Sequence, residues 1–105
     1  MKKQATQKRL CIVIVNYKTS ELTVQAVASL QSQIDITQDY IVVVDNDSGD
    51  NSLAFIEKEL NNRNWLGFVK LIDSGKNGGF SYGNNIGIKA IDAQYYFLLL
   101  SLIHI

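Results

Sequence analysis

Three polar segments of the sequence contain residues that could contact a ligand, and each follows an apolar run. They are NYKTSE (16–21), DNDSGDNS (45–52) and DSGKNGGFSYGNN (73–85). Each leads into a segment with helical spacing, and the free N–H groups of a helix N-terminus favour anions. The polar side chains of these segments can therefore reach a ligand, and the free N–H groups favour one with an anionic group.

The segment KNGGFSYGNNIG (76–87) combines backbone freedom with several amide side chains. It holds four of the seven glycines of the chain, together with three asparagines. Glycine reaches backbone angles closed to other residues and lets another group approach the main chain closely. Asparagine tolerates left-handed conformations and bonds to nearby backbone. The segment is therefore either a tight structural joint or a surface shaped to hold a ligand.

Three familiar binding motifs are missing where they would be needed. The sequence has no GxxxxGK[ST] element, which argues against a P-loop NTPase. A dinucleotide fingerprint would place GxGxxG after the first apolar run, where NYKTSE has no glycine. DNDSGD (45–50) departs from a calcium loop because Gly49 comes one position early and no helix precedes it. An Asx turn with a helix cap is expected of this loop, whatever else the loop does.

Composition indicates one small globular domain or a piece of a larger one. The chain has 105 residues with 47% hydrophobic content, and ten basic residues balance ten acidic ones. No overall field therefore draws it to nucleic acid or to a membrane. The pure apolar runs reach about half a dozen residues, which is too short for a transmembrane segment.

Several isolated features receive no functional role. Cys11 lies in an apolar run and is expected to be a buried, inert thiol. Lys76 could approach a diphosphate, but a single loop lysine is more often solvated. His104 stands alone, whereas metal sites need several ligands. Residues 1–9 are interpreted as a flexible basic lead-in and not as a signal peptide, with weak contact to anionic lipid as the alternative.

Short apolar runs alternate with segments of helical spacing along the chain. We expect strands at 11–15, 41–44, 69–72 and 95–100. Each intervening segment places apolar or small residues on one face: Leu22, Ala26, Val27 and Leu30, then Leu53, Ile56 and Leu60, then Gly83, Gly87, Ala90 and Ile91. Thr19 or Ser20 is the expected N-cap of the first helix. This alternation predicts an α/β fold with a mostly parallel sheet between helical layers.

Three stretches, taken in order, resemble family 2 glycosyltransferases with the GT-A fold. They are IVIVNYKTSELTVQAVASLQSQ (12–33), YIVVVDNDSGDNS (40–52) and KNGGFSYGNNIGIK (76–89). The rhamnosyltransferase-like branch is most similar, through VVDN-x-S-x-D-x-S and N-x-GF-x-x-G-x-N-x-G. The resemblance implies the Rossmann-like, nucleotide-binding half of a GT-A domain, with a three-layer arrangement and strand order 3-2-1-4.

The resemblance also implies that a nucleotide-diphosphate sugar binds at the carboxyl ends of the strands. Asn16 and Tyr17 would lie near the base and ribose. Asn46, which follows Asp45, corresponds to the position that reads a base edge, where an amide offers both a donor and an acceptor.

In the glycine-rich segment the resemblance implies donor contacts at Asn77, Gly79, Gly83 and either Asn84 or Asn85, with Phe80 packed beneath. Helix–sheet packing alone is the alternative explanation for Gly83 and Gly87. Packing is the preferred interpretation for Gly87, whereas ligand binding is preferred for Gly79 and Asn85.

The resemblance stops after the fourth apolar run. Family members carry an Asp-x-Asp-type motif there that binds a divalent metal, but here YYFLLL is followed by SLIHI, and Asp92 is the last carboxylate. We therefore expect residues 10–100 to be the N-terminal donor-binding part and 101–105 to be a tail foreign to the family. Magnesium or manganese and a catalytic base are expected of a full-length parent, with no cofactor or catalytic residue in this chain.

The expected function is that of a bacterial glycosyltransferase fragment that is inactive by itself. The parent would transfer a sugar from a nucleotide diphosphate, such as dTDP-rhamnose or a UDP-sugar, to a polysaccharide or lipid-linked acceptor. Its expected location is the cytoplasm, at the inner face of the membrane. Two alternatives are a small nucleotide-binding α/β domain without catalysis and a structural or interaction fragment without a ligand.

Overall fold

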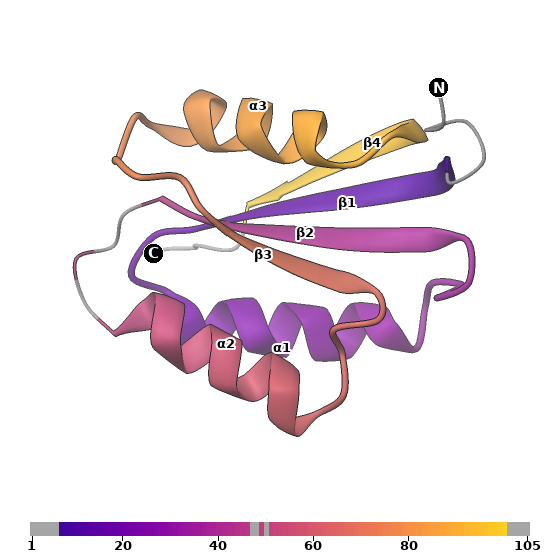
Figure 1. Cartoon of the computed structure of the whole chain (residues 1–105), viewed down its shortest axis with the longest axis horizontal. Helices are drawn as coiled ribbons and strands as arrows, with labels where there is room; N and C mark the ends of the chain where they lie inside the picture. Colours follow the sequence, from indigo (N-terminus) through magenta and orange to yellow (C-terminus); the bar gives the residue numbers. More distant parts are fainter. Residues whose placement is uncertain (1–6, 47–48, 50, 101–105) are drawn as a thin grey trace.

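The structure, a computed structural model, describes residues 7–46, 49 and 51–100. The predicted tail and most of the predicted lead-in lie outside these residues, as do Asp47, Ser48 and Asp50. Strands and helices alternate throughout (Figure 1). The elements are β1 (Lys8–Asn16), α1 (Ser20–Gln31), β2 (Asp39–Asp45), α2 (Ser52–Asn62), β3 (Val69–Asp73), α3 (Phe80–Ala90) and β4 (Ala93–Leu100).

All four strands run parallel in one sheet with the order β3-β2-β1-β4, which confirms the predicted arrangement. β1 lies between β2 and β4, so Ile12 pairs with Ile41 on one side and with Phe97 on the other. β1 begins earlier than expected, and Lys8 and Arg9 belong to the strand instead of a flexible lead-in. Their N–H groups donate to the carbonyls of residues 92 and 38, which extends the strand.

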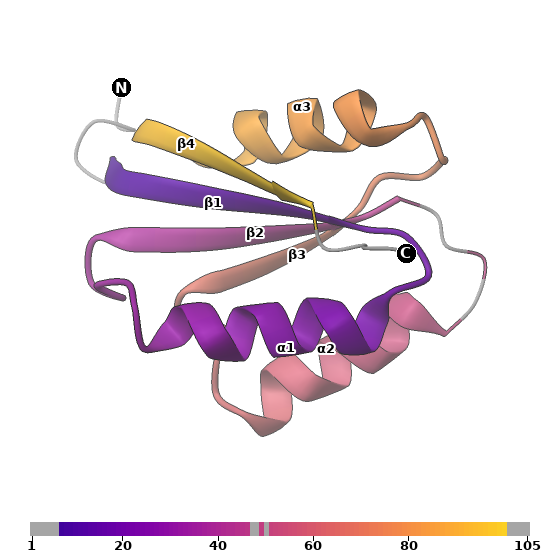
Figure 2. The ribbon, with the colours of Figure 1, turned by 180° about the vertical axis from the view of Figure 1, so that it is seen from behind.

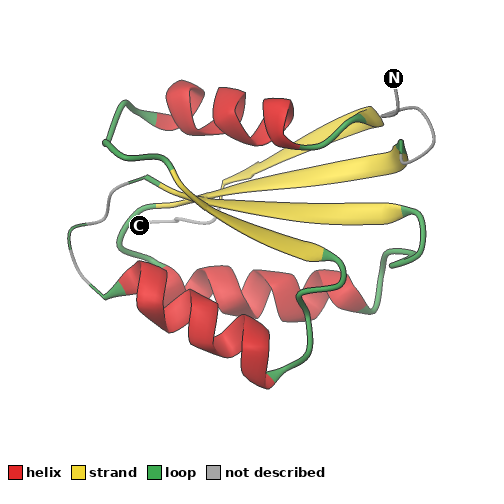
Figure 3. Ribbon diagram, in the orientation of Figure 1, coloured by secondary structure: helices red, strands yellow, loops and turns green. Residues whose placement is uncertain are grey.

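Helices cover both faces of the sheet (Figures 2 and 3). One core contains Ile12, Ile14, Ile41, Val43 and Val69 with Val27, Ile56 and Leu60 of α1 and α2. The other contains Cys11, Val13, Val42 and Val44, packed against α3. The two sets alternate along β1 and β2 because successive side chains of a strand point to opposite faces. None of the helices in the described part of the chain has the length and apolar character that spanning a membrane requires.

The buried face of α1 differs from the predicted one. Leu22 is 44% exposed, so its assignment to the core was wrong, whereas Thr23, Val24 and Val27 are buried. Thr23 occupies the inner position because its hydroxyl donates to Asn16 Oδ1 at 2.7 Å. The hydrogen-bonded Thr23 is therefore buried against the sheet, whereas hydrophobic spacing predicted that Leu22 would be.

Two glycines allow α3 to lie directly on the sheet. A Cβ added at Gly83 would come within 2.9 Å of Val15 Cγ1, and one at Gly87 within 2.4 Å of Val13 Cγ1. Both distances are shorter than van der Waals contact, so a larger residue would push the helix away from β1. This confirms the packing interpretation of Gly87.

The edge strand β4 carries several exposed apolar side chains. β3 forms one edge and β4 the other. On β4 the side chains of Tyr95 and Phe97 are 66% and 53% exposed, and Leu98 is 44% exposed. Residues 93–100 contain neither a charged residue nor a proline, which are common protections of an exposed edge.

An ion pair ties β1 to the start of β2, at the end of the sheet opposite the polar loops. Arg9 Nε and Nη2 donate to the two carboxylate oxygens of the fully buried Asp39, at 3.0 and 2.7 Å. The hydrogen bond and the charge of Asp39 raise the pKa of the Arg9 guanidinium above its ordinary value. The same carboxylate accepts the N–H of Asp35 at 2.9 Å, so this corner is held independently of the candidate site.

Cys11 lies fully buried in β1, and burial raises the pKa of its thiol to about 12. The thiolate is the reactive form, so almost none is present at neutral pH. We expect the folded chain to react with a disulfide reagent such as DTNB at least about a hundredfold more slowly than the urea-unfolded chain at pH 8. Comparable rates in the folded and unfolded states would contradict the buried position.

Candidate functional site

The three polar loops meet where the parallel strands end, at the carboxyl-terminal edge of the sheet. This edge runs across the strands and is distinct from the lateral edges formed by β3 and β4. β1, β2 and β3 end there at Asn16, Asp45 and Asp73, which are neighbours in the strand register. In Figure 1 this edge lies at the left, on the same side as the N-terminal ends of the helices. The polar residues that end three strands are therefore brought together.

Asn16 is a buried joint between β1, β2 and α1. Its side chain is 0% exposed, and its Nδ2 donates to Asp45 Oδ1 at 2.8 Å. Its Oδ1 accepts from the hydroxyls of Thr19 at 3.2 Å and Thr23 at 2.7 Å. Thr19 is the N-cap residue of α1, as predicted, but its hydroxyl bonds to Asn16 and not to the helix backbone. Because Asn16 is 0% exposed, its contact with a base stays a prediction that this arrangement does not favour.

Asn46 connects the end of β2 to the glycine-rich loop. Its Nδ2 donates to Asn77 Oδ1 at 3.2 Å and to the Gly79 carbonyl at 3.0 Å, and its Oδ1 accepts the Ser74 hydroxyl at 3.1 Å. The residue is 2% exposed. Both N–H groups of the amide are therefore engaged within the protein, so reading of a base edge by Asn46 stays a prediction that this arrangement does not favour.

Gly79 and Gly83 are both predicted to contact the donor, but they differ in their surroundings. Gly79 has φ +96°, a conformation that favours glycine, and an added Cβ there would meet nothing within 4 Å. Open space at Gly79 is compatible with the predicted donor contact. At Gly83 the side chain of Val15 occupies the space that a Cβ would take, which favours the alternative of helix–sheet packing over a donor contact.

Two tyrosines at this edge each lie beneath a lysine. Lys18 Nζ is 5.3 Å from the ring centroid of Tyr17, and Lys76 Nζ is 5.1 Å from that of Tyr82. Tyr17 is 37% exposed and follows β1 directly, which makes its ring available to a ligand. The ring of Tyr82 lies against Gly78, where an added Cβ would come within 2.5 Å of it. Both lysines place positive charge at the strand ends.

The remaining predicted residues lie on α3. Asn85 is exposed, whereas Asn84 is 4% exposed and its Oδ1 has no hydrogen-bond partner among the described residues. Phe80 is 40% exposed, so its predicted packing beneath the loop was wrong. Phe80 is the first residue of α3. That helix contacts the sheet closer to its C-terminus, through the face that carries Gly83 and Gly87.

The carboxylates of the described residues do not form a metal site. No group of three or more His, Cys, Asp or Glu in the described ranges is placed to hold an ion. Asp45 and Asp73 are paired in register, but Asp45 is buried and accepts from Asn16, while Asp73 Oδ1 accepts the N–H of Gly75 at 3.0 Å. The divalent metal expected of a longer parent stays a prediction.

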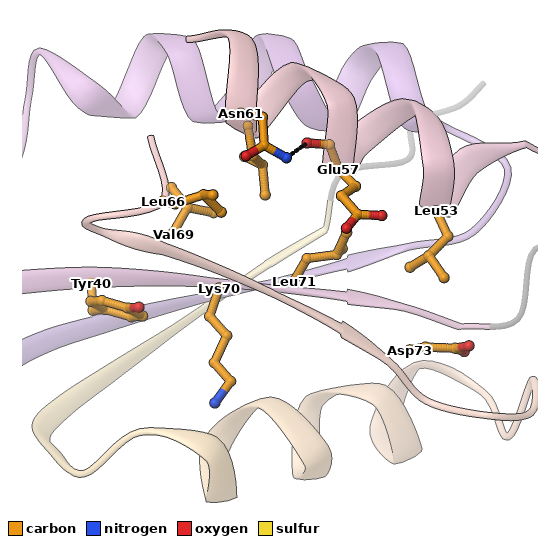
Figure 4. Close-up of a pocket in the computed structure, with 10 residues that line it drawn as sticks. Tyr40, Leu53, Glu57, Asn61, Leu66, Val69, Lys70, Leu71 and Asp73 are labelled. Atoms are coloured by element: carbon orange, nitrogen blue, oxygen red, sulfur yellow. Dashed lines mark hydrogen bonds between the residues drawn. The ribbon is translucent and has the colours of Figure 1, made fainter. Parts of the chain in front are cut away.

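A cavity of about 470 Å³ lies apart from this edge, along β3 and α2 (Figure 4). Its lining includes Leu53 and Glu57 of α2 with Lys70 and Leu71 of β3. It reaches the strand ends only through Asp73, and none of the strand-end amides lines it. The cavity is therefore not the predicted donor site.

Sequence reasoning missed two residues of this cluster, Thr23 and Ser74. Thr23 looks like an ordinary helix residue, and only its distance of 2.7 Å from Asn16 Oδ1 reveals its role. Ser74 is separated from Asn46 by 28 residues, yet its hydroxyl contacts that amide. A weak signal was available for Ser74, since it directly follows a strand in a polar loop.

Comparisons with known proteins agree with this architecture. Among solved structures, the chain is similar to "Crystal structure of S. aureus TarS 1-349", with a TM-score of 0.69 and 23% sequence identity. The similarity covers 89% of this chain and 27% of that chain, so this chain spans about a quarter of that length. At this identity the likeness shows a shared fold, a GT-A-type α/β arrangement. A search of curated proteins finds no match. A family model described as "Glycosyl transferase family 2" matches residues 11–100, and the chain therefore belongs to glycosyl transferase family 2.

Proposed function

We propose that residues 11–100 form the donor-binding part of a glycosyltransferase and hold a nucleotide-diphosphate sugar where β1, β2 and β3 end. Family membership supports the class of reaction. The observation that carries the proposal is the continuous set of hydrogen bonds joining the three strand ends, from Asn16 through Asp45 and from Asn46 to Asn77. This set holds the loops in fixed positions beside an exposed tyrosine.

Each part of the donor has a counterpart at this edge. The exposed ring of Tyr17 offers a stacking surface to the base. The N-terminus of α3, which no side chain caps, offers free N–H groups to the diphosphate. Lys18 and Lys76 add positive charge, and open space at Gly79 lets the donor approach the main chain. In this proposal Asn16 and Asn46 position their neighbours, while Asn77 and Asn85 remain available to a ligand.

The proposal assigns donor binding, and not transfer, to these residues. Sugar transfer needs a base for the acceptor hydroxyl and a positive partner for the leaving diphosphate. No group of three or more metal ligands lies among the described residues. We propose that the base and the metal are supplied by other parts of a longer protein. We further propose dTDP-rhamnose or a UDP-sugar as donor, a polysaccharide or lipid-linked acceptor, and a cytoplasmic site of action at the inner face of the membrane.

Calorimetry with UDP and dTDP tests the proposal. We expect the 105-residue chain to bind at least one of them, and Tyr17→Ala to weaken binding about tenfold through loss of stacking. Chelation of divalent metal should leave the affinity of the chain unchanged. Tyr95→Ala is the matched control, because Tyr95 is 66% exposed but pairs with Leu10 near the opposite end of the sheet.

Two outcomes would overturn the assignment. Absence of binding to both nucleotides would favour a structural or interaction role for this chain. Equal losses of affinity in Tyr17→Ala and Tyr95→Ala would show that binding does not occur at the predicted edge.

A further inference from the structure

Ser74, directly after β3, contacts two segments of the candidate site through its hydroxyl. Its Oγ lies 3.1 Å from Asn46 Oδ1 and 2.7 Å from the Lys76 carbonyl oxygen. Both neighbours are acceptors, and a serine hydroxyl carries a single proton, so they share it. The Ser74 backbone is also held: its N–H donates to the Asp45 carbonyl at 3.0 Å, and its carbonyl accepts the Tyr82 hydroxyl at 3.3 Å. Ser74 therefore has a fixed place from which to orient its neighbours.

The orientation of the Asn46 amide follows from unambiguous backbone partners. Nδ2 of Asn46 lies 3.0 Å from the Gly79 carbonyl, which can only accept, so the amide nitrogen must face that residue. The oxygen then faces the Ser74 hydroxyl. Gly79 N–H in turn donates to Asn77 Oδ1 at 3.3 Å, and Asn46 Nδ2 donates to the same oxygen. The Asn77 oxygen is thus directed into the cluster, and its own Nδ2 is left on the exposed side.

We propose that Ser74 is a positioning residue of the donor site, an inference that rests on the proposed function. Its hydroxyl orients Asn46, and Asn46 holds Asn77 and Gly79. The exposed amide nitrogen of Asn77 is thereby aimed at the edge, where it donates to an anionic oxygen of a nucleotide diphosphate. Ser74 itself contacts no ligand in this arrangement.

The composition of the loop explains why one hydroxyl has this influence. Gly75 and Gly79 have φ of +87° and +96°, and Gly78 lies between them. A loop with so many glycines has many accessible conformations, so its own backbone preference does not select one. The hydrogen bonds around Asn46 select it, and pre-organisation of a binding loop increases affinity by reducing the ordering cost of binding.

The test compares Ser74→Ala with Ser74→Thr, which keeps the hydroxyl, and with Ser32→Ala as a matched control. Ser32 is an exposed serine at the C-terminal end of α1, away from the strand ends, and its hydroxyl donates to the Ser29 carbonyl at 3.3 Å. Calorimetry with UDP and dTDP is combined with amide hydrogen exchange of Gly79 in the ligand-free chain. We expect Ser74→Ala to weaken nucleotide binding about fivefold and to speed Gly79 exchange severalfold. Ser74→Thr and Ser32→Ala should stay within about twofold of the unmodified chain in both readouts.

The two readouts separate this inference from the proposed function. If the unmodified chain binds neither nucleotide, the proposed function fails, and with it the donor-positioning role. Gly79 exchange still reports in that case whether Ser74 orders the loop. If the chain binds nucleotide but Ser74→Ala changes neither affinity nor Gly79 exchange, the positioning role of Ser74 is overturned while the proposed function stands. Equal losses in Ser74→Thr and Ser74→Ala also overturn it, because the hydroxyl would then not be the group that matters.

Discussion

Asn16→Asp is expected to destabilise the folded chain by about 3 kcal/mol at pH 7, because it places a second carboxylate against a buried one. The substitution preserves shape but replaces the Nδ2 donor, 2.8 Å from Asp45 Oδ1, with an acceptor. Both residues are buried, at 0% and 4% exposure, so water screens the repulsion poorly. Urea unfolding followed by circular dichroism measures the loss.

The loss of unfolding free energy in Asn16→Asp should depend on pH in a defined direction. The carboxyl introduced at position 16 lies against another carboxylate, which raises its pKa above the unfolded value of about 3.9. The destabilisation is then fully present above the raised pKa and shrinks as pH falls, because one protonated carboxyl donates as the amide did. Asn61→Ala is the control, since it removes only an exposed hydrogen bond to the Glu57 carbonyl. A deficit independent of pH, or equal to that of Asn61→Ala, would contradict the buried contact with Asp45.

Gly87→Ala should lower the free energy of unfolding by about 2 kcal/mol, although alanine is the better helix former. The added Cβ would lie 2.4 Å from Val13 Cγ1 and 3.3 Å from Val44 Cγ2. Both valines are 0% exposed and belong to neighbouring central strands, so they have little room to move. Overpacking of about 3 kcal/mol outweighs a helix-propensity gain of about 1 kcal/mol.

A double-mutant cycle identifies the clash as the cause. Val13→Ala removes the methyl groups in question, so Gly87→Ala should cost less in that background than in the unmodified chain. Gly67→Ala serves as the control, because an added Cβ there meets nothing within 4 Å. Additive effects of Gly87→Ala and Val13→Ala would show that α3 does not rest on β1 at this position.

Much of the fold was predictable because the cores of β1 and β2 are made of β-branched residues with few polar interruptions. That composition suits strands covered on both faces, as at 41–44. The strand ends were not predictable in the same way. Lys8 and Arg9 join β1 through backbone hydrogen bonds, which do not depend on side-chain type. The exposure of Leu22 also escaped prediction, because helical spacing alone does not show that Thr23 has a buried acceptor to satisfy.

The candidate site was predictable as a location but less so in its internal roles. Polar residues at the ends of parallel strands must gather at one edge, and Asn16, Asp45 and Asn46 do so. Whether such an amide faces a ligand or another strand depends on partners remote in sequence. Asn16 meets Asp45 across 29 residues, and Asn46 meets Asn77 across 31. No local pattern encodes those distances, so two residues expected to contact a donor, Asn16 and Asn46, are buried and hydrogen-bonded within the protein.

The central position of β1 has a consequence for synthesis of the chain on the ribosome. Of the four described strands, β1 is synthesised first, yet it pairs on one side with β4, where Lys8 is opposite Ala93. A nascent chain can therefore close the β1–β2 pair early, but the other side of β1 stays open until nearly all the described residues have been made. Parallel pairing between such remote segments is slow because a long loop must be ordered first. The apolar segment Leu10–Val15 is thus the part of the nascent chain with the longest need of protection from other chains.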